Sequence, residues 1–295
     1  MAFEIEHNYV RTNGITLHVA QCGPMNGPLV VLLHGFPEFW YSWRKQIPAL
    51  AEAGYRVWAP DQRGYNLSDK PSGVSSYSID KLGADIIGLL DAAGQAKAII
   101  IGHDWGAAVA WWLAARYPAR VAQVAILNVP HPAVLFRALG KAPLQLVKSW
   151  YIFFFQLPLL PEKLFRRKEY RFGRGSLRGT SRPDTFSSYD LQQYVRAWAQ
   201  PGALTAMINW YRASFRASRR GRVGRITVPV RLLWGQQDAL LEPVLARLSL
   251  KMCDKGELTY FKEATHWLHQ EEPKAVNRLL LEFMQGQGQP QVQKV

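Results

Sequence analysis

Short apolar segments alternate with longer amphipathic ones through the first half of the chain. Apolar, β-branched runs predict buried strands at 29–33, 55–59, 97–101 and 121–127. The segments between them predict helices near 43–53, 78–93 and 107–117. In front of this pattern, segments 4–12 and 15–21 flank Asn13-Gly14 and predict a β-hairpin. The alternation is typical of a parallel sheet that is covered by helices on both faces.

The alternation is interrupted in the middle of the chain. Residues 141–225 are helix-like, aromatic and basic, with no clear strand pattern. Strand patterns resume at 228–234 and 257–261, and a closing helix is predicted at 273–284. We therefore expect an α/β core of residues 1–140 and 226–295, into which a helical cap of residues 141–225 is inserted. The Gln/Gly-rich tail from 285 to 295 is expected to be frayed.

Charge is concentrated in the expected cap. The chain has a formal net charge of +14, and segment 141–225 holds 17 Lys/Arg against 4 Asp/Glu. A basic surface can attract nucleic acid, anionic lipid or an acidic substrate. No zinc-finger or other nucleic-acid motif accompanies the charge, so a solvated basic surface is the favoured interpretation and no nucleic-acid partner is expected.

The composition and the N-terminal sequence indicate in which cellular compartment the protein is expected. An apolar content of 48% and a charged content of 20% are globular values. The polar N-terminus lacks the order of a signal peptide, and the longest apolar run, 150–160, is too short to span a bilayer. Two cysteines fit a reducing compartment. We expect a cytoplasmic protein with no transmembrane segment, no metal site and no cofactor.

The segment Gly102-His103-Asp104-Trp105-Gly106 carries the strongest chemical signal. It joins a predicted strand to a predicted helix, and glycines stand two residues to either side of Asp104. A nucleophile elbow has this form. A carboxylate there can attack carbon and form an alkyl-enzyme ester. Taken alone, the same pentapeptide also fits an ordinary Gly/Asp turn.

Other segments supply partners for such a nucleophile. Backbone N–H groups of Phe36 and Trp105 are candidate oxyanion donors, one after a strand and one after the nucleophile. His266, in the loop after the last core strand, is the candidate general base, and His269 is a competitor expected at a helix edge or surface. Asp238 follows strand 228–234 and is the candidate orienting acid, although a turn aspartate would look the same.

Five segments together resemble the α/β-hydrolase-fold epoxide hydrolases of the soluble, bacterial type. They are 34–38 with 41–44 (HGFPE and YSWR), 61–65 (DQRGY), 102–106 (GHDWG), 234–238 (WGQQD) and 264–267 (ATHW). The resemblance extends from about residue 34 to residue 273. It implies a mostly parallel eight-stranded sheet with helices on both faces and an inserted helical cap. It also implies opening of an epoxide to a vicinal diol by Asp104, followed by ester hydrolysis by water that His266 activates.

The resemblance also assigns roles in the cap. Tyr151 and Tyr211 match the family's two tyrosines, which act as acids toward the epoxide oxygen. For Tyr151, an aromatic core residue is the simpler alternative. The implied pocket is apolar and fits an apolar epoxide; its lining comprises Phe36, Trp105, Phe154, Phe155 and Trp210.

One departure and two rival functions stay open. Asn66 stands where the family often has glycine, but asparagine tolerates a left-handed backbone. His34, Asp61 and Arg63 are expected to brace loops.

A haloalkane or fluoroacetate-type dehalogenase could share the elbow. However, Phe36 has no side-chain donor for a halide, and Ala107 and Ala108 stand where an arginine would be needed to bind a carboxylate. A non-catalytic binding module is the weaker rival, and a homo-oligomer is left open.

Overall fold

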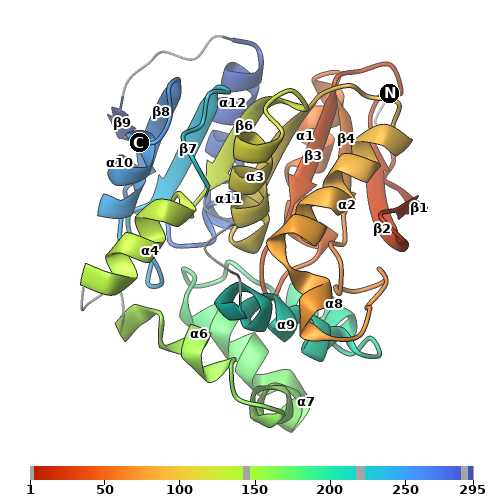
Figure 1. The fold of residues 1–295 in the computed structure, drawn as a ribbon, viewed down its shortest axis with the longest axis vertical. Helices are drawn as coiled ribbons and strands as arrows, with labels where there is room; N and C mark the ends of the chain where they lie inside the picture. The colour runs from red at the N-terminus through yellow and green to blue at the C-terminus, as the bar shows by residue number, and fades with distance from the viewer. Residues whose placement is uncertain (1–2, 142–146, 217–222, 287–291, 295) are drawn as a thin grey trace.

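A single sheet organises the core of the molecule. The computed structural model describes residues 3–141, 147–216, 223–286 and 292–294. In these parts of the chain nine strands form one sheet, in the order β1-β2-β4-β3-β5-β6-β7-β8-β9 (Figure 1). The strands are β1 (Glu6–Thr12), β2 (Ile15–Cys22), β3 (Leu29–Leu33), β4 (Arg56–Pro60), β5 (Ala98–His103), β6 (Val121–Leu127), β7 (Val230–Gly235), β8 (Gly256–Phe261) and β9 (Val292–Lys294).

The strand directions confirm the predicted architecture. β1 and β2 form the expected antiparallel hairpin, and Asn13 and Gly14 both have positive φ in its turn. β2 pairs with β4 antiparallel, and all later pairings in the sheet are parallel. The eight expected strands are present, and β9 extends the edge beside β8. The prediction of a frayed tail was therefore wrong for residues 292–294; residues 287–291 and 295 lie outside the described residues.

Helices bury both faces of the sheet. Alternate residues of β3 divide between two hydrophobic clusters: Val30 and Leu32 join one, Val31 and Leu33 the other. The first cluster packs under α1 (Ile47–Glu52), α11 (Leu268–Glu271) and α12 (Pro273–Met284). The second packs under α2 (Ile79–Ala92), α3 (Trp105–Arg116), α4 (Pro132–Lys141) and α10 (Val244–Leu250). Because both faces are covered there, the central strand β3 is apolar and buried along its whole length, whereas the edge strand β1 is polar and largely exposed.

Further helices lie at one end of the sheet, in the lower part of Figure 1. They are α6 (Trp150–Phe154), α7 (Leu160–Gly179, kinked at 167–170), α8 (Ser188–Trp198) and α9 (Ala203–Arg216). Two short 3-10 helices, η1 (Trp40–Trp43) and η2 (Val74–Tyr77), lie in the loops of the core. We refer to residues 147–216 as the helical layer. The ends of the predicted cap remain a prediction, because 142–146 and 217–222 lie outside the described residues.

The strand order places two loops side by side beneath the helical layer. β3 has β4 on one side and β5 on the other, so the order changes direction at β3. Leu33 at the end of β3 pairs with Gly102 near the end of β5. The residues that follow these strands therefore emerge together at the carboxyl edge, where open α/β sheets bind ligands.

One further result concerns membranes. Within the described residues, no helix is both long and apolar enough to cross a bilayer.

Candidate active site

Asp104 sits on a sharp turn between β5 and α3. Its backbone has φ 48° and ψ −122°, which is unusual for a residue other than glycine. The flanking glycines are required sterically. A Cβ at Gly102 would overlap the carbonyl oxygen of Gly106, and one at Gly106 would overlap the carbonyl oxygen of Leu33. From the loop after β3, Gly35 is also required, because a Cβ there would overlap the Asp104 side chain. The elbow expected from the sequence is therefore present, and it exposes the Asp104 carboxylate at the end of the sheet.

A backbone donor holds one oxygen of this carboxylate. The N–H of Phe36 donates to Asp104 Oδ1 at 2.7 Å. Phe36 comes from the loop after β3, so the adjacency of β3 and β5 creates the contact. The predicted second donor, the N–H of Trp105, is on the first residue of α3. Its role as an oxyanion donor stays a prediction.

His266 lies between two carboxylates. Its Nδ1 is 2.8 Å from Asp238 Oδ2, and its Nε2 is 3.7 Å from Asp104 Oδ2. Burial alone would lower the pKa of His266, but Asp238 and Asp104 outweigh it and raise that pKa to about 10. The structure thus brings together the three residues that the sequence placed far apart, with His266 turned toward the predicted nucleophile.

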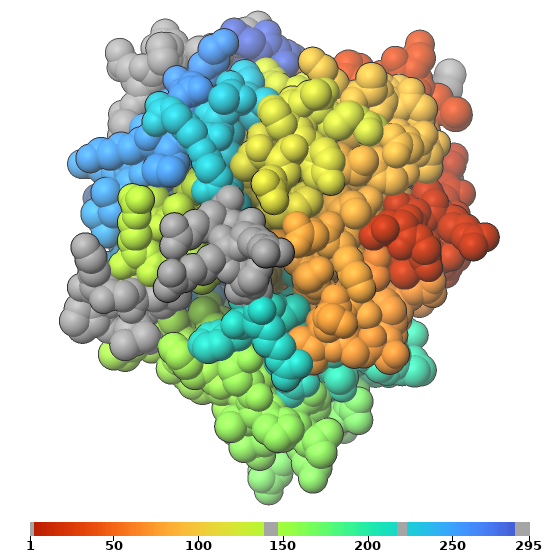
Figure 2. Space-filling model, in the orientation of Figure 1, coloured from red at the N-terminus to blue at the C-terminus, as the bar shows by residue number. Residues whose placement is uncertain are grey.

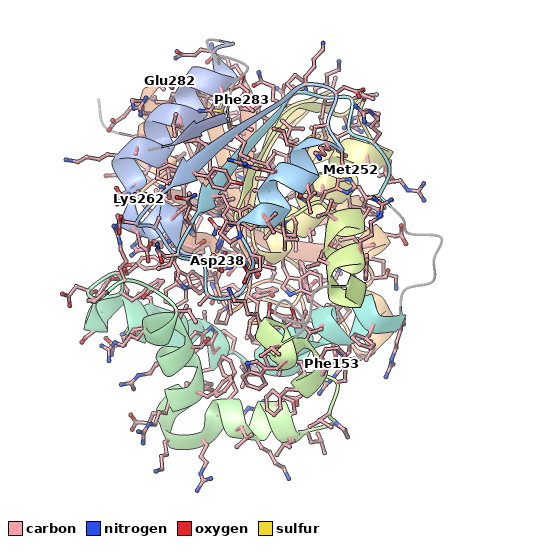
Figure 3. The ribbon with its side chains drawn as sticks, turned by 90° about the vertical axis from the view of Figure 1, so that its left-hand side faces the viewer. Phe153, Asp238, Met252, Lys262, Glu282 and Phe283 are labelled. Carbon is pink, nitrogen blue, oxygen red and sulfur yellow. The ribbon has the colours of Figure 1, made fainter. Side chains whose placement is uncertain are left out.

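Asp238 is held in its ionised form by several donors. Burial acts to raise the pKa of Asp238, but interaction with His266 and donated hydrogen bonds hold it below its ordinary value. The Asn128 amide donates to Oδ2 at 2.6 Å, and the N–H groups of Leu240 and Leu241 donate to Oδ1 at 2.7 and 3.0 Å. Figure 3 labels Asp238 where the sheet meets the helical layer.

Asn128 is a site residue that the sequence analysis missed. Besides contacting Asp238, its Oδ1 accepts the N–H of Gly235 at 3.0 Å, and its φ is 54°. It therefore joins the end of β6 to the loop that carries Asp238. Its position directly after a buried parallel strand was the available signal, because the other chemical residues occupy equivalent positions.

The two predicted tyrosines face the elbow from the helical layer. The rings of Tyr151 and Tyr211 are 6.0 Å apart, and the Tyr211 ring lies 5.0 Å from the Trp105 ring and 5.2 Å from the Phe36 ring. Burial raises the pKa of both phenols well above its ordinary value, and the charge of Asp104 acts in the same direction. Both hydroxyls are therefore protonated and available as hydrogen-bond donors at neutral pH.

Apolar side chains surround this group. Phe155, Ile208 and Tyr211 form a small buried cluster, against which Phe36, Trp105, Tyr151, Ile152 and Phe154 pack. Four of the five predicted pocket residues therefore gather here, together with Ile208, which was not predicted. Trp210 is not part of this small cluster: its indole N–H donates to the carbonyl of Arg63 at 3.0 Å, and its ring makes T-shaped contacts with the rings of Tyr65 and Trp105.

A buried Glu38–His103–His269 cluster supports the site from behind. Nδ1 of His103 contacts Glu38 Oε2 at 2.7 Å, and its Nε2 contacts the carbonyl oxygen of His266 at 2.9 Å. Burial acts to raise the pKa of Glu38, but His103 outweighs it and holds that pKa well below the ordinary range. Both His103 nitrogens thus face hydrogen-bond acceptors. The cluster has the residue types of a metal site, but both ring nitrogens of His103 are already engaged, one by Glu38 and one by the carbonyl oxygen of His266.

The expectation for His269 was wrong. It was placed at a helix edge or surface, but it is fully buried, with its ring 5.0 Å from Trp43 and 4.4 Å from His103. Its Nε2 lies 3.4 Å from Glu38 Oε1. Burial and the neighbouring His103 lower the pKa of His269 to about 4, so it is neutral. The sequence failed here because the burial comes from η1, which is far away along the chain.

The expected loop-bracing residues do brace loops. His34 Nε2 accepts the N–H of Gln62 at 3.0 Å. Asp61 accepts from the Trp40 N–H at 3.0 Å and from the Asn66 amide at 2.8 Å. Arg63 makes a bidentate pair with Asp85. Asn66 has a positive φ of 40°, so the backbone here has the conformation expected at a position where the family often has glycine.

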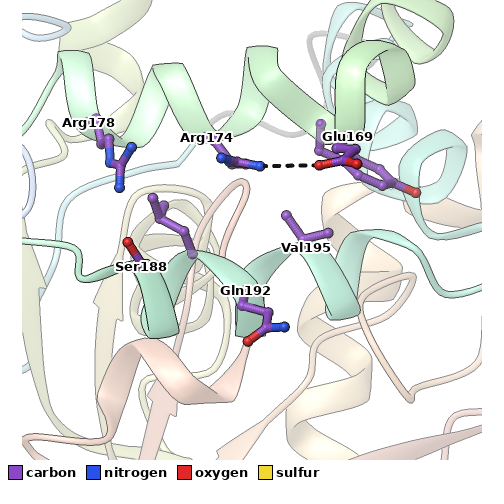
Figure 4. A pocket seen from close by; sticks show the side chains of 8 residues that line it. Glu169, Arg174, Arg178, Ser188, Gln192 and Val195 are labelled. Carbon is purple, nitrogen blue, oxygen red and sulfur yellow. Dashed lines mark ion pairs between the residues drawn. The ribbon is translucent and has the colours of Figure 1, made fainter.

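A separate cavity of about 380 Å³ lies within the helical layer, between α7 and α8 (Figure 4). Its lining includes Arg174, Arg178 and Gln192, and Arg174 lies 4.0 Å from Glu169. None of the predicted catalytic residues contributes to this lining. We therefore do not assign it to the candidate site.

Comparison with known proteins agrees with this geometry. The model of the alpha/beta hydrolase fold family matches residues 28–273. A crystal structure of an epoxide hydrolase from Bacillus megaterium superposes with a TM-score of 0.85 at 30% identity, covering 94% of this chain and all of the other. Epoxide hydrolase A from Mycobacterium thermoresistibile gives a TM-score of 0.82 at 34% identity, over 96% and 99% of the two chains. The chain belongs to the epoxide hydrolase family of α/β hydrolases.

Curated relatives point to the same family. Epoxide hydrolase A of Mycobacterium tuberculosis is 36% identical, over 94% of this chain and 96% of the relative. Mouse epoxide hydrolase 4 is 38% identical, over 94% and 79%. A protein with a less specific name, the AB hydrolase superfamily protein YfhM of Bacillus subtilis, is 50% identical over 96% and 99%. Family and fold thus agree with the sequence resemblance.

Proposed function

We propose that this protein hydrolyses apolar epoxides to vicinal diols through an ester of Asp104. One observation carries the proposal. Asp104 has Oδ1 on the Phe36 N–H at 2.7 Å and Oδ2 facing His266 at 3.7 Å, beneath the paired rings of Tyr151 and Tyr211. A carboxylate nucleophile, a base and two phenol donors therefore converge on one apolar site.

In the first step, the epoxide oxygen accepts hydrogen bonds from Tyr151 and Tyr211. Asp104 Oδ2 attacks one ring carbon, a C–O bond forms, and the C–O bond of the ring breaks. One phenol supplies the proton that converts the departing alkoxide to a hydroxyl group. The product of this step is a hydroxyalkyl ester of Asp104, and no cofactor takes part.

In the second step, His266 takes a proton from water, and the resulting hydroxide attacks the ester carbonyl carbon. Asp104 Oδ1 carries the developing negative charge and is already held by the Phe36 N–H, with Trp105 N–H proposed as the second donor. Asp238 fixes the ring orientation of His266 and stabilises its charged form. Collapse of the intermediate breaks the ester C–O bond; the departing alkoxide takes the proton of the added hydroxyl group, so the diol is released and Asp104 is left ionised. His266 returns the proton that it took from water to the phenolate, which restores the donating tyrosine.

The surroundings support three narrower proposals. The aromatic and aliphatic lining around Asp104 suits an apolar epoxide. Residues 141–225 act as a lid over the site, because the segment contributes both tyrosines. The two cysteines, Cys22 and Cys253, are free and buried, which supports a cytoplasmic location.

The decisive test is capture of the ester. His266→Ala, mixed with a simple aryl epoxide, should gain the full mass of the substrate on the peptide that carries Asp104. Asp104→Ala is the matched control and should gain no mass and release no diol. Absence of an adduct in His266→Ala, with a substrate that the unaltered protein turns over, would contradict the ester mechanism.

The same preparation separates the rival functions. Diol release and halide release should be measured side by side on aryl epoxides and haloalkanes. Halide without diol would support a dehalogenase, and neither product would support a binding module. Phe36 has no side-chain donor, and Ala107 and Ala108 cannot clamp a carboxylate, so we expect diol alone.

A further inference from the structure

Large apolar side chains are exposed together on one segment of the helical layer. A soluble surface carries such side chains singly, and a contiguous group marks an interaction site. We call this group the apolar face; its members are Val147, Trp150, Phe153, Leu157, Leu159, Leu160 and Leu164. Seven of the exposed large apolar residues thus fall within one short stretch, 147–164. In Figure 2 the yellow-green and green segment that includes most of this stretch forms the lower lobe of the molecule.

The apolar face is distinct from the lining of the candidate site. Side chains of α6 and of Phe155, which follows it, point in two directions. Tyr151 and Phe155 pack toward Asp104, whereas Trp150 is 56% exposed and Phe153 is 47% exposed. The ring of Phe153, labelled in Figure 3, lies 5.6 Å from the ring of Phe215, which is itself exposed at the end of α9. The outward side chains therefore contribute little to the pocket, and their exposure needs another explanation.

The leucines of this face are held outward by the fold. Arg212 donates to the carbonyl oxygens of Phe155 at 3.1 Å and Leu157 at 2.7 Å, and it pairs with the buried Glu162 at 2.7 Å. These contacts fix both ends of the loop that carries Leu159, which is 66% exposed. The buried Arg212–Glu162 pair therefore holds this loop in a conformation that leaves its leucine side chains exposed to solvent.

Cations border the apolar face. Exposed basic side chains lie among and after its last members along α7: Lys163, Arg166, Arg167, Lys168 and Arg171. The acids of the same helix offset little of this charge, because Glu162 is buried against Arg212 and only Glu169 is exposed. Helices that bind the interface of an anionic membrane expose Trp, Phe and Leu side chains next to Lys and Arg side chains.

We propose that the apolar face docks on the surface of an anionic lipid bilayer, with the exposed cations of α7 on the headgroups and Trp150, Phe153 and Leu159 in the interface. A second copy of this chain fits less well. The basic surfaces of the two copies would face and repel each other, since segment 141–225 of each copy holds 17 Lys/Arg and 4 Asp/Glu. An anionic bilayer supplies both the apolar phase and the opposite charge.

Docking would also bring substrate to the site, a point that rests on the proposed function. Apolar epoxides concentrate in bilayers because they are poorly solvated by water. Tyr151 shares α6 with Trp150 and Phe153, so the docked face and the proposed epoxide donor lie on one short helix. The docking itself does not depend on this and can be measured without any epoxide.

Sedimentation with vesicles tests the docking on the full chain. The protein should bind phosphatidylcholine vesicles that contain phosphatidylglycerol and should bind pure phosphatidylcholine far more weakly. Lys163→Glu with Arg167→Glu should weaken binding at least about 25-fold, since each cation near an anionic surface contributes roughly fivefold. Lys97→Glu with Lys274→Glu changes net charge equally at exposed core positions and should have a much smaller effect.

A second pair of variants tests the apolar contribution. Trp150→Ser with Leu159→Ser should reduce vesicle binding at least about tenfold, whereas Met25→Ser with Val244→Ser removes exposed apolar side chains from the core and should not. Both pairs should keep the urea midpoint and the diol activity of the unaltered protein in vesicle-free buffer.

Two results would overturn the proposal. One is vesicle binding that the face variants leave unchanged. The other is a protein that ignores anionic vesicles but sediments as a dimer, which Trp150→Ser with Leu159→Ser converts to a monomer. The second result would make the face an interface between copies. Because vesicle binding is measured without substrate, its failure is separate from failure of the epoxide hydrolase function.

Discussion

The charge of Asp104 should control when His266 becomes a base. In the unreacted site His266 lies between two carboxylates and its pKa is raised to about 10, so the ring is protonated at neutral pH. Ester formation neutralises Asp104. The substitution Asp104→Asn reproduces that loss of charge with little change of shape, and asparagine tolerates the positive φ at this position.

The magnitude follows from the distance. At 3.7 Å between His266 Nε2 and Asp104 Oδ2, and an effective dielectric constant of about 20, the interaction is about 4.5 kcal/mol. Since one pH unit corresponds to about 1.4 kcal/mol, the titration midpoint of His266 should fall by about three pH units. The base would then become available near neutral pH only after Asp104 has reacted.

Nuclear magnetic resonance of the histidine rings measures this midpoint. The His266 signal is assigned by its loss in His266→Gln, and Asp91→Asn, a surface substitution remote from the site, is the matched control. A midpoint for Asp104→Asn that stays within one pH unit of the unaltered protein would refute the reasoning.

The same shift predicts a stability profile. A histidine whose pKa is raised on folding contributes stability that is complete below its ordinary value of 6.5 and is lost as the pH rises through about 10. Urea unfolding of the unaltered protein should therefore show a loss of stability between these limits. Asp104→Asn should show a smaller loss over that range, and an unchanged profile would contradict the assignment.

Three further predictions concern other parts of the site. Tyr151→Phe and Tyr211→Phe should each slow ester formation in single-turnover experiments, and the double variant should lose at least about a hundredfold; a loss under tenfold would exclude phenol acids. Glu38→Gln removes the buried carboxylate that contacts His103 Nδ1 at 2.7 Å and should lower the free energy of unfolding by about 3 kcal/mol in urea, where no change would show that this buried contact does not stabilise the fold. Gly106→Ala should abolish the folded elbow, measured by circular dichroism and diol release, whereas Gly175→Ala, in open space on α7, should be neutral or stabilising by about 1 kcal/mol.

The sequence alone predicted most of the architecture. Buried parallel strands are continuously apolar, so their positions are visible in a single chain, and β3, β5 and β6 matched their predicted ranges closely. The elbow was also visible, because it is local: Gly102 and Gly106 flank Asp104 within five residues. Steric requirements between neighbouring residues can therefore be predicted directly from the sequence.

Contacts between distant segments were harder to predict. His269 looked like a surface residue because its neighbours are polar, yet it is buried by Trp43, more than two hundred residues earlier. Asn128 gave only a weak signal, because its partners Gly235 and Asp238 come from another strand. Trp210 is adjacent to Tyr211, but it packs against Tyr65 and one edge of Trp105 and is not part of the small cluster that contains Tyr211.

The sequence by itself determined which residue types were present and which strand ends carried them, because periodicity and tight turns are properties of neighbouring residues. Only the tertiary structure decided that Phe36 meets Asp104, that His266 lies between two carboxylates, and that Trp150 faces outward while Tyr151 faces inward. These relations depend on strand order and on packing of the helical layer. Both arise from contacts between segments that are remote along the chain.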